Sequence, residues 1–246
     1  MGKYLVLMPS FNEEGNIERI ILNIKALLKD IPVVVINDGS SDKTSFIAKR
    51  SGATVLDFPF NLGYGVALQA GYKFALEGGY DFVVQIDADG QHNVEDIKRL
   101  TQEIKNDSAD IVIGSRFLGS TVYKMDLIRR IGVLLFGWIV TVCIKQKITD
   151  CTSGFQAINR RALEFYCQDI FPSDFPDADI IILSHFAGLR IKEVPVVMHK
   201  SPPEKQQMHS GLTKLYYIFK MFLSITVTLL SEKPKRISNG GGLNVS

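Results

Sequence analysis

The chain has 246 residues, of which 46% are hydrophobic and 22% are charged. These proportions are those of a folded globular protein, and they exclude a disordered chain, a collagen-like repeat and a small disulfide-rich domain. The 28 lysines and arginines nearly balance the 26 aspartates and glutamates, and a net charge of +2 argues against a nucleic-acid-binding protein.

Short apolar runs alternate with segments of helical periodicity along the first 115 residues. We expect strands at residues 3–8, 33–36, 54–56, 81–86 and 111–113, and helices at 13–28, after 42, at 65–76 and at 94–104. This alternation predicts an α/β fold with a mostly parallel sheet and helices on both faces. In such sheets ligands bind beyond the carboxyl ends of the strands.

The pattern changes after residue 115. Apolar helices are predicted at 127–144, 179–186 and 212–230. The run 131–144 carries no charge, but as a helix it would reach only about 21 Å, which is shorter than the ~30 Å hydrocarbon core of a bilayer. We therefore predict a single domain over 1–231 with two halves, 1–115 and 116–231, and a flexible tail at 232–246.

The sharpest chemical signal is the segment Asp87-Ala88-Asp89-Gly90-Gln91-His92, which directly follows an apolar strand. Two carboxylates two residues apart at a strand end can bind a hard divalent cation, and Gln91 offers a further oxygen. Mg²⁺ and Mn²⁺ usually complete their coordination with substrate phosphates. We therefore predict a metal site at Asp87, Asp89 and Gln91, and we expect His92 to be an ordinary loop histidine.

Three other strand ends bring polar or glycine-containing segments to the same edge, at residues 9–14, 37–42 and 61–65. In this arrangement Asp38 can accept hydrogen bonds from a nucleobase, and Phe11 offers a surface beside it. Taken alone, residues 37–42 are equally well explained as a capped turn that enters a helix.

A resemblance to the family 2 glycosyltransferases, which have the GT-A fold, rests on the joint occurrence of four segments. They are Pro9-Ser10-Phe11-Asn12-Glu13, Asp38-Gly39-Ser40-Ser41-Asp42, Asn61-Leu62-Gly63-Tyr64-Gly65 and the segment 87–92. Tyr64 stands where many members carry lysine. Three later segments are similar to the polyprenyl-phosphate, dolichol-phosphate-mannosyltransferase-like branch: Gly114-Ser115-Arg116-Phe117, Asp150-Cys151-Thr152-Ser153-Gly154-Phe155 and Glu193-Val194-Pro195.

The resemblance implies inverting transfer of a sugar from a nucleotide-sugar with the help of Mg²⁺ or Mn²⁺. It makes residues 1–115 the nucleotide-binding half and 116–231 the acceptor half. The residues that would hold the nucleotide are Pro9, Phe11, Glu13, Asp38 and Asp87. Asp87 would lie near the ribose or the metal, which Asp89 and Gln91 would bind.

The acceptor half offers cations and carboxylates. The resemblance implies that Arg116, together with Arg129 or Arg130, binds an acceptor phosphate. A lipid phosphate is already anionic, so it needs cations to position it more than a base, and guanidinium groups suit bidentate phosphate contacts. A hydroxyl acceptor would instead need a general base, for which Asp150 and Asp179 are the candidates.

Residues 199–236 contain seven lysines or arginines and two acids around an apolar segment. This pattern predicts a basic amphipathic helix that contacts an anionic membrane surface or a small membrane-protein partner. The predicted location is therefore cytoplasmic and peripheral, on the inner face of the cell membrane.

We predict transfer of a hexose or N-acetylhexosamine from a UDP- or GDP-sugar to an undecaprenyl-type polyprenyl phosphate in cell-envelope biogenesis. Two alternatives remain: a polysaccharide glycosyltransferase with a sugar hydroxyl as acceptor, and a catalytically silent GT-A-like scaffold for a membrane partner. A Rossmann dehydrogenase is excluded because residues 63–68 lack the third glycine and do not open the first strand–helix turn, and no P-loop motif occurs.

Overall fold

The computed structural model describes residues 2–119, 127–199 and 211–237, and the side chains of these residues except 127–129 and 211–215. Its centre is a seven-stranded sheet in the order β3-β2-β1-β4-β6-β5-β7. The strands are β1 (Tyr4–Ser10), β2 (Val33–Asn37), β3 (Thr54–Asp57), β4 (Phe82–Gln85), β5 (Ile111–Ser115), β6 (Gln156–Asn159) and β7 (Ile191–Pro195). Only β6 runs against the others in this described sheet, since it pairs antiparallel with both β4 and β5.

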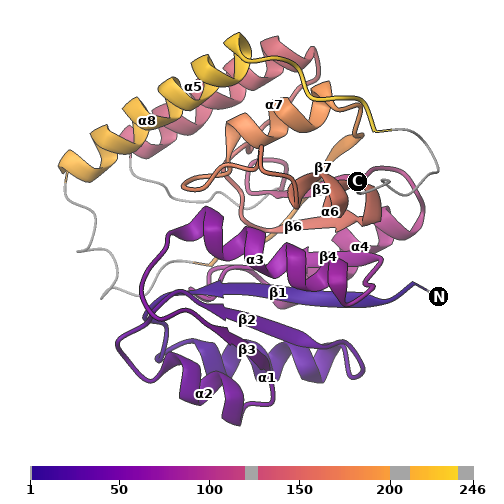
Figure 1. The fold of residues 1–246 in the computed structure, drawn as a ribbon, viewed down its shortest axis with the longest axis vertical. Coiled ribbons are helices and arrows are strands. Elements are labelled where there is room, and N and C mark those ends of the chain that lie inside the picture. Colours follow the sequence, from indigo (N-terminus) through magenta and orange to yellow (C-terminus); the bar gives the residue numbers. More distant parts are fainter. Residues whose placement is uncertain (1, 120–126, 200–210, 238–246) are drawn as a thin grey trace.

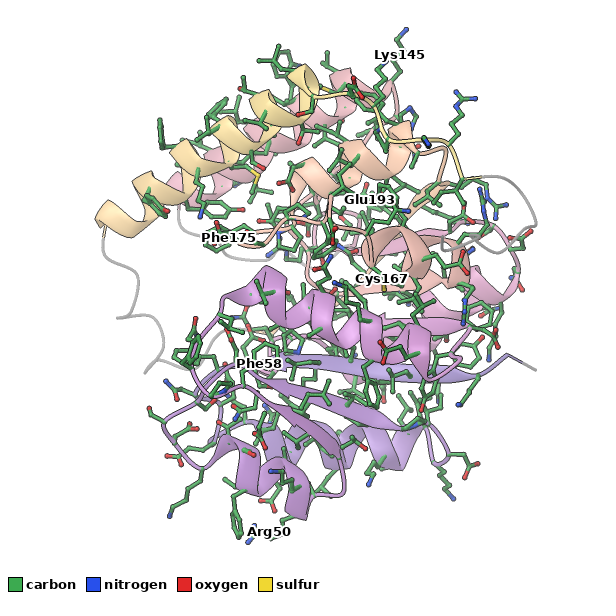
Figure 2. All side chains as sticks on the ribbon, viewed as in Figure 1. Arg50, Phe58, Lys145, Cys167, Phe175 and Glu193 are labelled. Carbon is green, nitrogen blue, oxygen red and sulfur yellow. The ribbon has the colours of Figure 1, made fainter. Side chains whose placement is uncertain are left out.

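Helices cover both faces of the sheet. They are α1 (Ile17–Leu27), α2 (Thr44–Arg50), α3 (Tyr64–Glu77), α4 (Ile97–Lys105), α5 (Leu127–Ile144), α6 (Arg160–Tyr166), α7 (Ala178–Phe186) and α8 (Gly211–Leu230). The side chains of α1, α2 and α4 pack on one face, and those of α3, α6 and α7 pack on the other. Beyond α7, α5 and α8 form a further layer (Figure 1). Arg50 on α2 and Lys145 after α5 extend outward at opposite ends of the molecule (Figure 2).

The two cores are built from alternate residues of the same strands. In β1, Leu5 and Leu7 face the α3 side, whereas Val6 and Met8 face the α1 side. This division follows from the two-residue period of a strand, and it explains why a strand buried on both faces reads as a continuous apolar run. The predicted α/β fold, with a mostly parallel sheet covered on both faces, is confirmed.

The structure differs from the sequence prediction in its later part. β6, α6 and β7 were not among the predicted elements. Residues 232–237 also differ from the predicted flexible tail, because the backbone N–H of Ile237 donates to the carbonyl of Ala187 at 3.0 Å. The carbonyl of Ile237 in turn accepts a hydrogen bond from Arg161 at 3.2 Å. The rest of the predicted tail, 238–246, lies outside the described residues.

Of the helices in the described ranges, none combines the length and the hydropathy that a membrane-spanning segment requires.

Candidate active site

The loops that follow β1 and β2 form one hydrogen-bonded unit. The N–H of Asp38 donates to the carbonyl of Ser10 at 2.9 Å, which extends the pairing of the two strands. Asn12, whose φ is 54°, accepts a hydrogen bond from the N–H of Ser41 at 2.9 Å through its side chain. The N–H of Glu13 donates to the hydroxyl of Thr44 at 2.7 Å. The two predicted strand ends are therefore joined at the carboxyl edge of the sheet.

Asp38 connects this unit to the loop after β3. Its carboxylate is 4% exposed and accepts the N–H of Leu62 at 2.7 Å and that of Gly63 at 3.1 Å. The adjacent Gly39 has a φ of +68°, and a Cβ there would lie 2.3 Å from the backbone of Phe60. Glycine is needed at this position because the two loops approach so closely. The two hydrogen bonds from Leu62 and Gly63 fix the Asp38 carboxylate at this edge of the sheet. Each of its oxygens can accept more than one hydrogen bond, so the fixed carboxylate can also accept one from a ligand.

The other residues predicted to hold the nucleotide differ in exposure. Pro9 is buried within β1, and Glu13 is 8% exposed and accepts a hydrogen bond from the side chain of Asn16 at 3.1 Å. Phe11 is 43% exposed, which leaves an aromatic surface at the edge where Asp38 lies.

Asp87 follows β4 and is held by two side chains. The hydroxyl of Tyr64 donates to Oδ1 of Asp87 at 2.8 Å, and Nε2 of His92 lies 3.5 Å from Oδ2. Burial raises the pKa of Asp87, but the contacts with His92 and Tyr64 and the charge of Arg116 outweigh it and hold the pKa below its ordinary value. His92 therefore belongs to the surroundings of Asp87 and is not a separate loop residue.

Gly154 lies directly against the Asp87 carboxylate. A Cβ at this position would lie 2.5 and 2.8 Å from the two carboxylate oxygens and 2.7 Å from the hydroxyl of Tyr64. Real Cβ atoms do not approach oxygen atoms so closely, and therefore any larger residue would displace Asp87 or the loop before β6. The absence of a side chain at Gly154 lets the loop before β6 pack directly against this carboxylate.

Asp89 and Gln91 follow Asp87 by two and four residues in the same loop. Oδ1 of Asp89 accepts the N–H of Gln91 at 2.9 Å, and the carbonyl of Gln91 accepts the N–H of His199 at 2.7 Å. Within the described ranges, no group of three or more His, Cys, Asp or Glu gathers as a metal site. Two carboxylates with one amide oxygen are nevertheless donors that suit Mg²⁺ or Mn²⁺, and these ions take few protein ligands when substrate phosphates supply the rest.

The three later segments of the sequence form one buried network. Arg116, after β5, donates from Nε and Nη2 to the two oxygens of Asp150 at 2.6 and 2.5 Å, and both residues are at most 4% exposed. Glu193 on β7 accepts the N–H of Thr149 at 2.9 Å and that of Asp150 at 2.8 Å. Because Asp150 is engaged with a buried guanidinium, its geometry favours a positioning role over that of a general base.

Asp179 lies at the first turn of α7 and faces α8. Its carboxylate accepts the N–H of Ile180 at 2.7 Å and a hydrogen bond from the hydroxyl of Ser224. Burial raises its pKa, and burial also raises the pKa of the neighbouring Asp177 to about 7. Among the described residues, the hydrogen bonds of Asp179 join it to α8 and to the start of its own helix, and none joins it to the carboxyl edge of the sheet.

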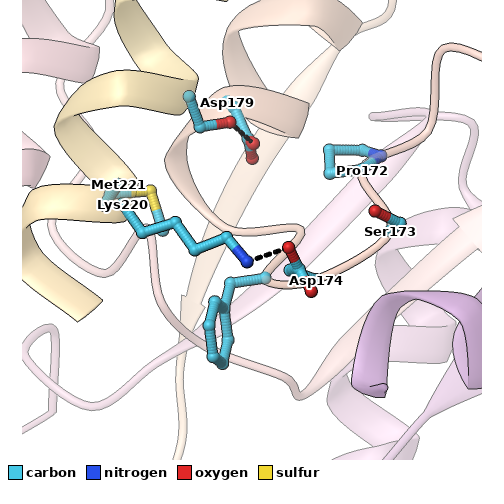
Figure 3. Close-up of a pocket in the computed structure, with 8 residues that line it drawn as sticks. Pro172, Ser173, Asp174, Asp179, Lys220 and Met221 are labelled. Carbon is cyan, nitrogen blue, oxygen red and sulfur yellow. Dashed lines mark hydrogen bonds and ion pairs between the residues drawn. The ribbon is translucent and has the colours of Figure 1, made fainter. Parts of the chain in front are cut away.

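A pocket of about 170 Å³ lies between α8 and the segment 172–175 (Figure 3). Asp179 and Lys220 line it, and Lys220 forms an ion pair with Asp174. A shallower apolar groove of about 370 Å³ continues from it along α7 and α8, lined in part by Leu183 and Val227.

Two of the predicted acceptor-binding arginines lie on α5. Arg130 is exposed at the first turn of the helix, and the side chain of Arg129 lies outside the described residues. Sequence reasoning missed the contacts of Tyr64 and Glu193, each of which holds a predicted site residue. The position of Tyr64, within the predicted strand-end segment 61–65, was the available signal.

Comparison with known proteins shows the family and the fold. Residues 5–167 match the family described as Glycosyl transferase family 2. Over 248 residues the chain is 30% identical to the UDP-N-acetylglucosamine–dolichyl-phosphate N-acetylglucosaminyltransferase of Methanococcus voltae, covering 93% of this chain and 96% of that protein. Over 218 residues it is 27% identical to the undecaprenyl-phosphate mannosyltransferase of Micrococcus luteus, covering 85% and 89%.

A similar solved structure is that of glucosyl-3-phosphoglycerate synthase from Mycobacterium tuberculosis in complex with Mn²⁺, UDP and glucosyl-3-phosphoglycerate. It aligns with a TM-score of 0.67 at 20% sequence identity and covers 96% of this chain and 82% of that chain. At this identity the likeness shows a shared fold.

Proposed function

Since the chain belongs to glycosyl transferase family 2 and has the GT-A fold, we propose that it transfers a hexose or N-acetylhexosamine from a UDP- or GDP-sugar to a polyprenyl phosphate. We place this reaction, which inverts the sugar's configuration, at the cytoplasmic face of a membrane. The observation that carries the proposal is the position of Asp38, Asp87 and Asp89 at the carboxyl edge of β1, β2 and β4.

The donor would lie across this edge. Asp38 would accept hydrogen bonds from the base, Phe11 would cover its ring, and Pro9 and Glu13 would shape the loop beneath. Asp87 would face the ribose or the metal. A UDP-sugar is the first donor to test, because the relative from Methanococcus voltae is named for UDP-N-acetylglucosamine.

Asp87, Asp89 and Gln91 would hold Mg²⁺ or Mn²⁺. When bound, the ion would offset the charge that develops on the leaving nucleoside diphosphate. Tyr64 and His92 keep the Asp87 carboxylate in one orientation, and their contacts together with the charge of Arg116 stabilise its charged form.

A phosphate acceptor fits the acceptor half better than a hydroxyl does. Both candidate bases are engaged, Asp150 with Arg116 and Asp179 with Ser224. An anionic lipid phosphate needs no base and would instead be positioned by cations, for which Arg129 and the exposed Arg130 are proposed. Arg116, also predicted for this role, is buried and paired with Asp150, so it would act by positioning the loop beside the acceptor. The names of the relatives, which act on dolichyl and undecaprenyl phosphate, support the same choice.

Calorimetry with UDP and GDP, each with and without Mn²⁺, tests the donor site. We expect Mn²⁺-dependent binding of one nucleotide, weakened about tenfold or more by Asp89→Ala because a carboxylate ligand is lost. Asp30→Ala, at an exposed position before β2, is the matched control and should bind as the wild type does. No binding of either nucleotide at concentrations that detect millimolar affinity would contradict the proposal and favour a silent scaffold.

The acceptor is tested with the same protein and a radiolabelled sugar donor. Label should pass to polyprenyl phosphate and not to an oligosaccharide, whereas transfer to the oligosaccharide alone would identify a polysaccharide glycosyltransferase.

A further inference from the structure

Helix α5 carries two apolar stripes on opposite sides. The inner stripe is at most 4% exposed and consists of Val133, Phe136, Val140 and Ile144. The outer stripe is 36% to 64% exposed and consists of Ile131, Leu134, Leu135, Trp138 and Val142. A helix that is apolar all round is ordinarily enclosed by protein or lipid, yet this outer stripe is open in the described structure.

Helix α8 repeats the pattern. Met221 and Ile225 face inward and are at most 4% exposed. The outward residues are 52% to 83% exposed and consist of Tyr216, Phe219, Leu223, Val227 and Leu230. Their spacing of three or four residues places them on one side of the helix.

The two outer stripes lie on neighbouring helices, on the side away from the core. Both helices pack on α7 through their inner stripes, and they lie side by side (Figure 1). Phe136 on α5 contacts Phe222 on α8, with ring centroids 5.2 Å apart. Because both inner stripes point to the core, both outer stripes point away from it. We call these ten outward residues the outer face.

Positive charge is concentrated in the two segments that carry the outer face. Residues 127–147 and 211–237 together contain nine lysines or arginines and one acid, a net charge of +8, and the remainder of the chain therefore carries −6. Lys145 extends from the end of α5 (Figure 2). A second copy that covered this face with its own would bring two such positive surfaces together, whereas anionic lipid is attracted to them.

We propose that the outer face lies on an anionic lipid bilayer, with α5 and α8 along the membrane plane. Trp138, Tyr216 and Phe219 are residue types that favour the membrane–water interface. The inference deepens the proposed function, because a polyprenyl acceptor would reside in that bilayer. It also extends the predicted contact from one C-terminal helix to a surface of two helices.

Trp138 is the only tryptophan of the chain and therefore reports on this surface directly. The full chain is mixed with vesicles of phosphatidylcholine, with or without phosphatidylglycerol. We expect Trp138 emission to shift to shorter wavelength and the protein to sediment with the vesicles that contain phosphatidylglycerol. High salt should weaken this binding, because part of it is electrostatic.

The double variant Val142→Glu with Phe219→Glu should bind these vesicles at least about tenfold more weakly, since two apolar contacts are replaced by charges. Both side chains are exposed, so the fold should persist, as circular dichroism would verify. Phe46→Glu is the matched control: Phe46 is 62% exposed on α2, on the other side of the sheet, and its replacement should leave vesicle binding unchanged.

Absence of sedimentation and of an emission shift with both vesicle types would overturn the inference. So would a dimer in light scattering that buries Trp138, because a second copy would then cover the face. Neither result would affect nucleotide binding in calorimetry, so failure of this inference is distinguishable from failure of the proposed function.

Discussion

Folded proteins usually expose charged side chains and bury apolar ones. The carboxyl edge of the sheet departs from this by burying charges, and the outer face departs from it by exposing apolar side chains. At the edge, charged groups such as Asp38, Arg116 and Asp150 are at most 4% exposed. On the outer face, Trp138 and Phe219 are about two-thirds exposed. Buried charges and exposed apolar surface are the two distributions that ordinary folding disfavours, and therefore each points to function.

The two regions differ in what completes them. Edge residues find partners within the chain: Asp150 pairs with Arg116, Asp38 with backbone N–H groups, and Asp87 with Tyr64. In the described structure the outer face has no covering element. The edge is thus organised before any ligand arrives, whereas the outer face requires material from outside the described chain.

The largest expected effect is the loss of stability when the buried ion pair of the edge is broken. Asp150→Ala leaves the Arg116 guanidinium buried without its carboxylate, which should lower the free energy of unfolding by about 3–5 kcal/mol in urea denaturation. Replacing both residues, Asp150→Ala with Arg116→Met, should recover part of this loss because no unpaired charge remains. A loss below about 0.5 kcal/mol for the single variant, as expected for the exposed control Asp30→Ala, would show that the edge does not depend on its internal pairing.

A smaller effect is expected at Gly154, which packs directly against the Asp87 carboxylate. Gly154→Ala places a methyl group against the Asp87 carboxylate, so the free energy of unfolding should fall by about 1–3 kcal/mol. Mn²⁺-dependent nucleotide binding in calorimetry should weaken with it. Gly15→Ala is the matched control, since a Cβ there meets no heavy atom within 4 Å. Equal nucleotide binding by both variants would contradict a role for this close packing in placing the Asp87 carboxylate.

The smallest effect concerns the attachment of α8, which carries half of the outer face. Tyr217 of α8 donates a hydrogen bond to Asp177 at 2.5 Å, and burial raises the pKa of Asp177 to about 7 from an ordinary 3.8. The folded state therefore holds a proton that the unfolded state has already released between about pH 4 and 7. This contribution to stability is complete below that range and is lost as the pH rises through 7.

Thermal unfolding between pH 5 and 8 measures this contribution. The wild type should lose about 1–2 kcal/mol across this range, discounted because Asp177 is partly exposed, and Asp177→Asn should flatten the profile. Asp179, Asp150 and Arg116 also act on this carboxyl and are unchanged in the variant. The exposed Asp169→Asn should keep the wild-type profile, and a profile unaltered by Asp177→Asn would locate the titration elsewhere.

Much of the fold was predictable because the first five strands are buried on both faces or bounded by clear turn segments. β6 and β7 were not predicted. β6 begins with Gln156 and ends with Asn159, and β7 contains Lys192 and Glu193, so neither reads as a buried strand. Their pairing with β4 and β5 defines them as strands, and those partners are distant in sequence.

The site was predictable where one rule was sufficient. Parallel strands end at one edge, and this placed Asp38 beside the loop that follows β1. That rule does not predict which side chains far apart in the sequence contact each other. Nothing local to Arg116 indicates that Asp150 neutralises it, and nothing local to Gly154 indicates that Asp87 lies against it. The roles of these residues in binding and catalysis stay predictions.

The reversed strand β6 also has a consequence for the order of folding. β1, β2 and β3 pair with neighbours that follow one another along the chain, so loop closure between them is short. The second edge of β4 pairs Phe82 with Asn159, and no earlier segment completes it in the described sheet. During synthesis the first four strands can assemble while that edge of β4 is still unpaired. Until β6 emerges, the nascent sheet presents an open strand edge, which other chains can pair with.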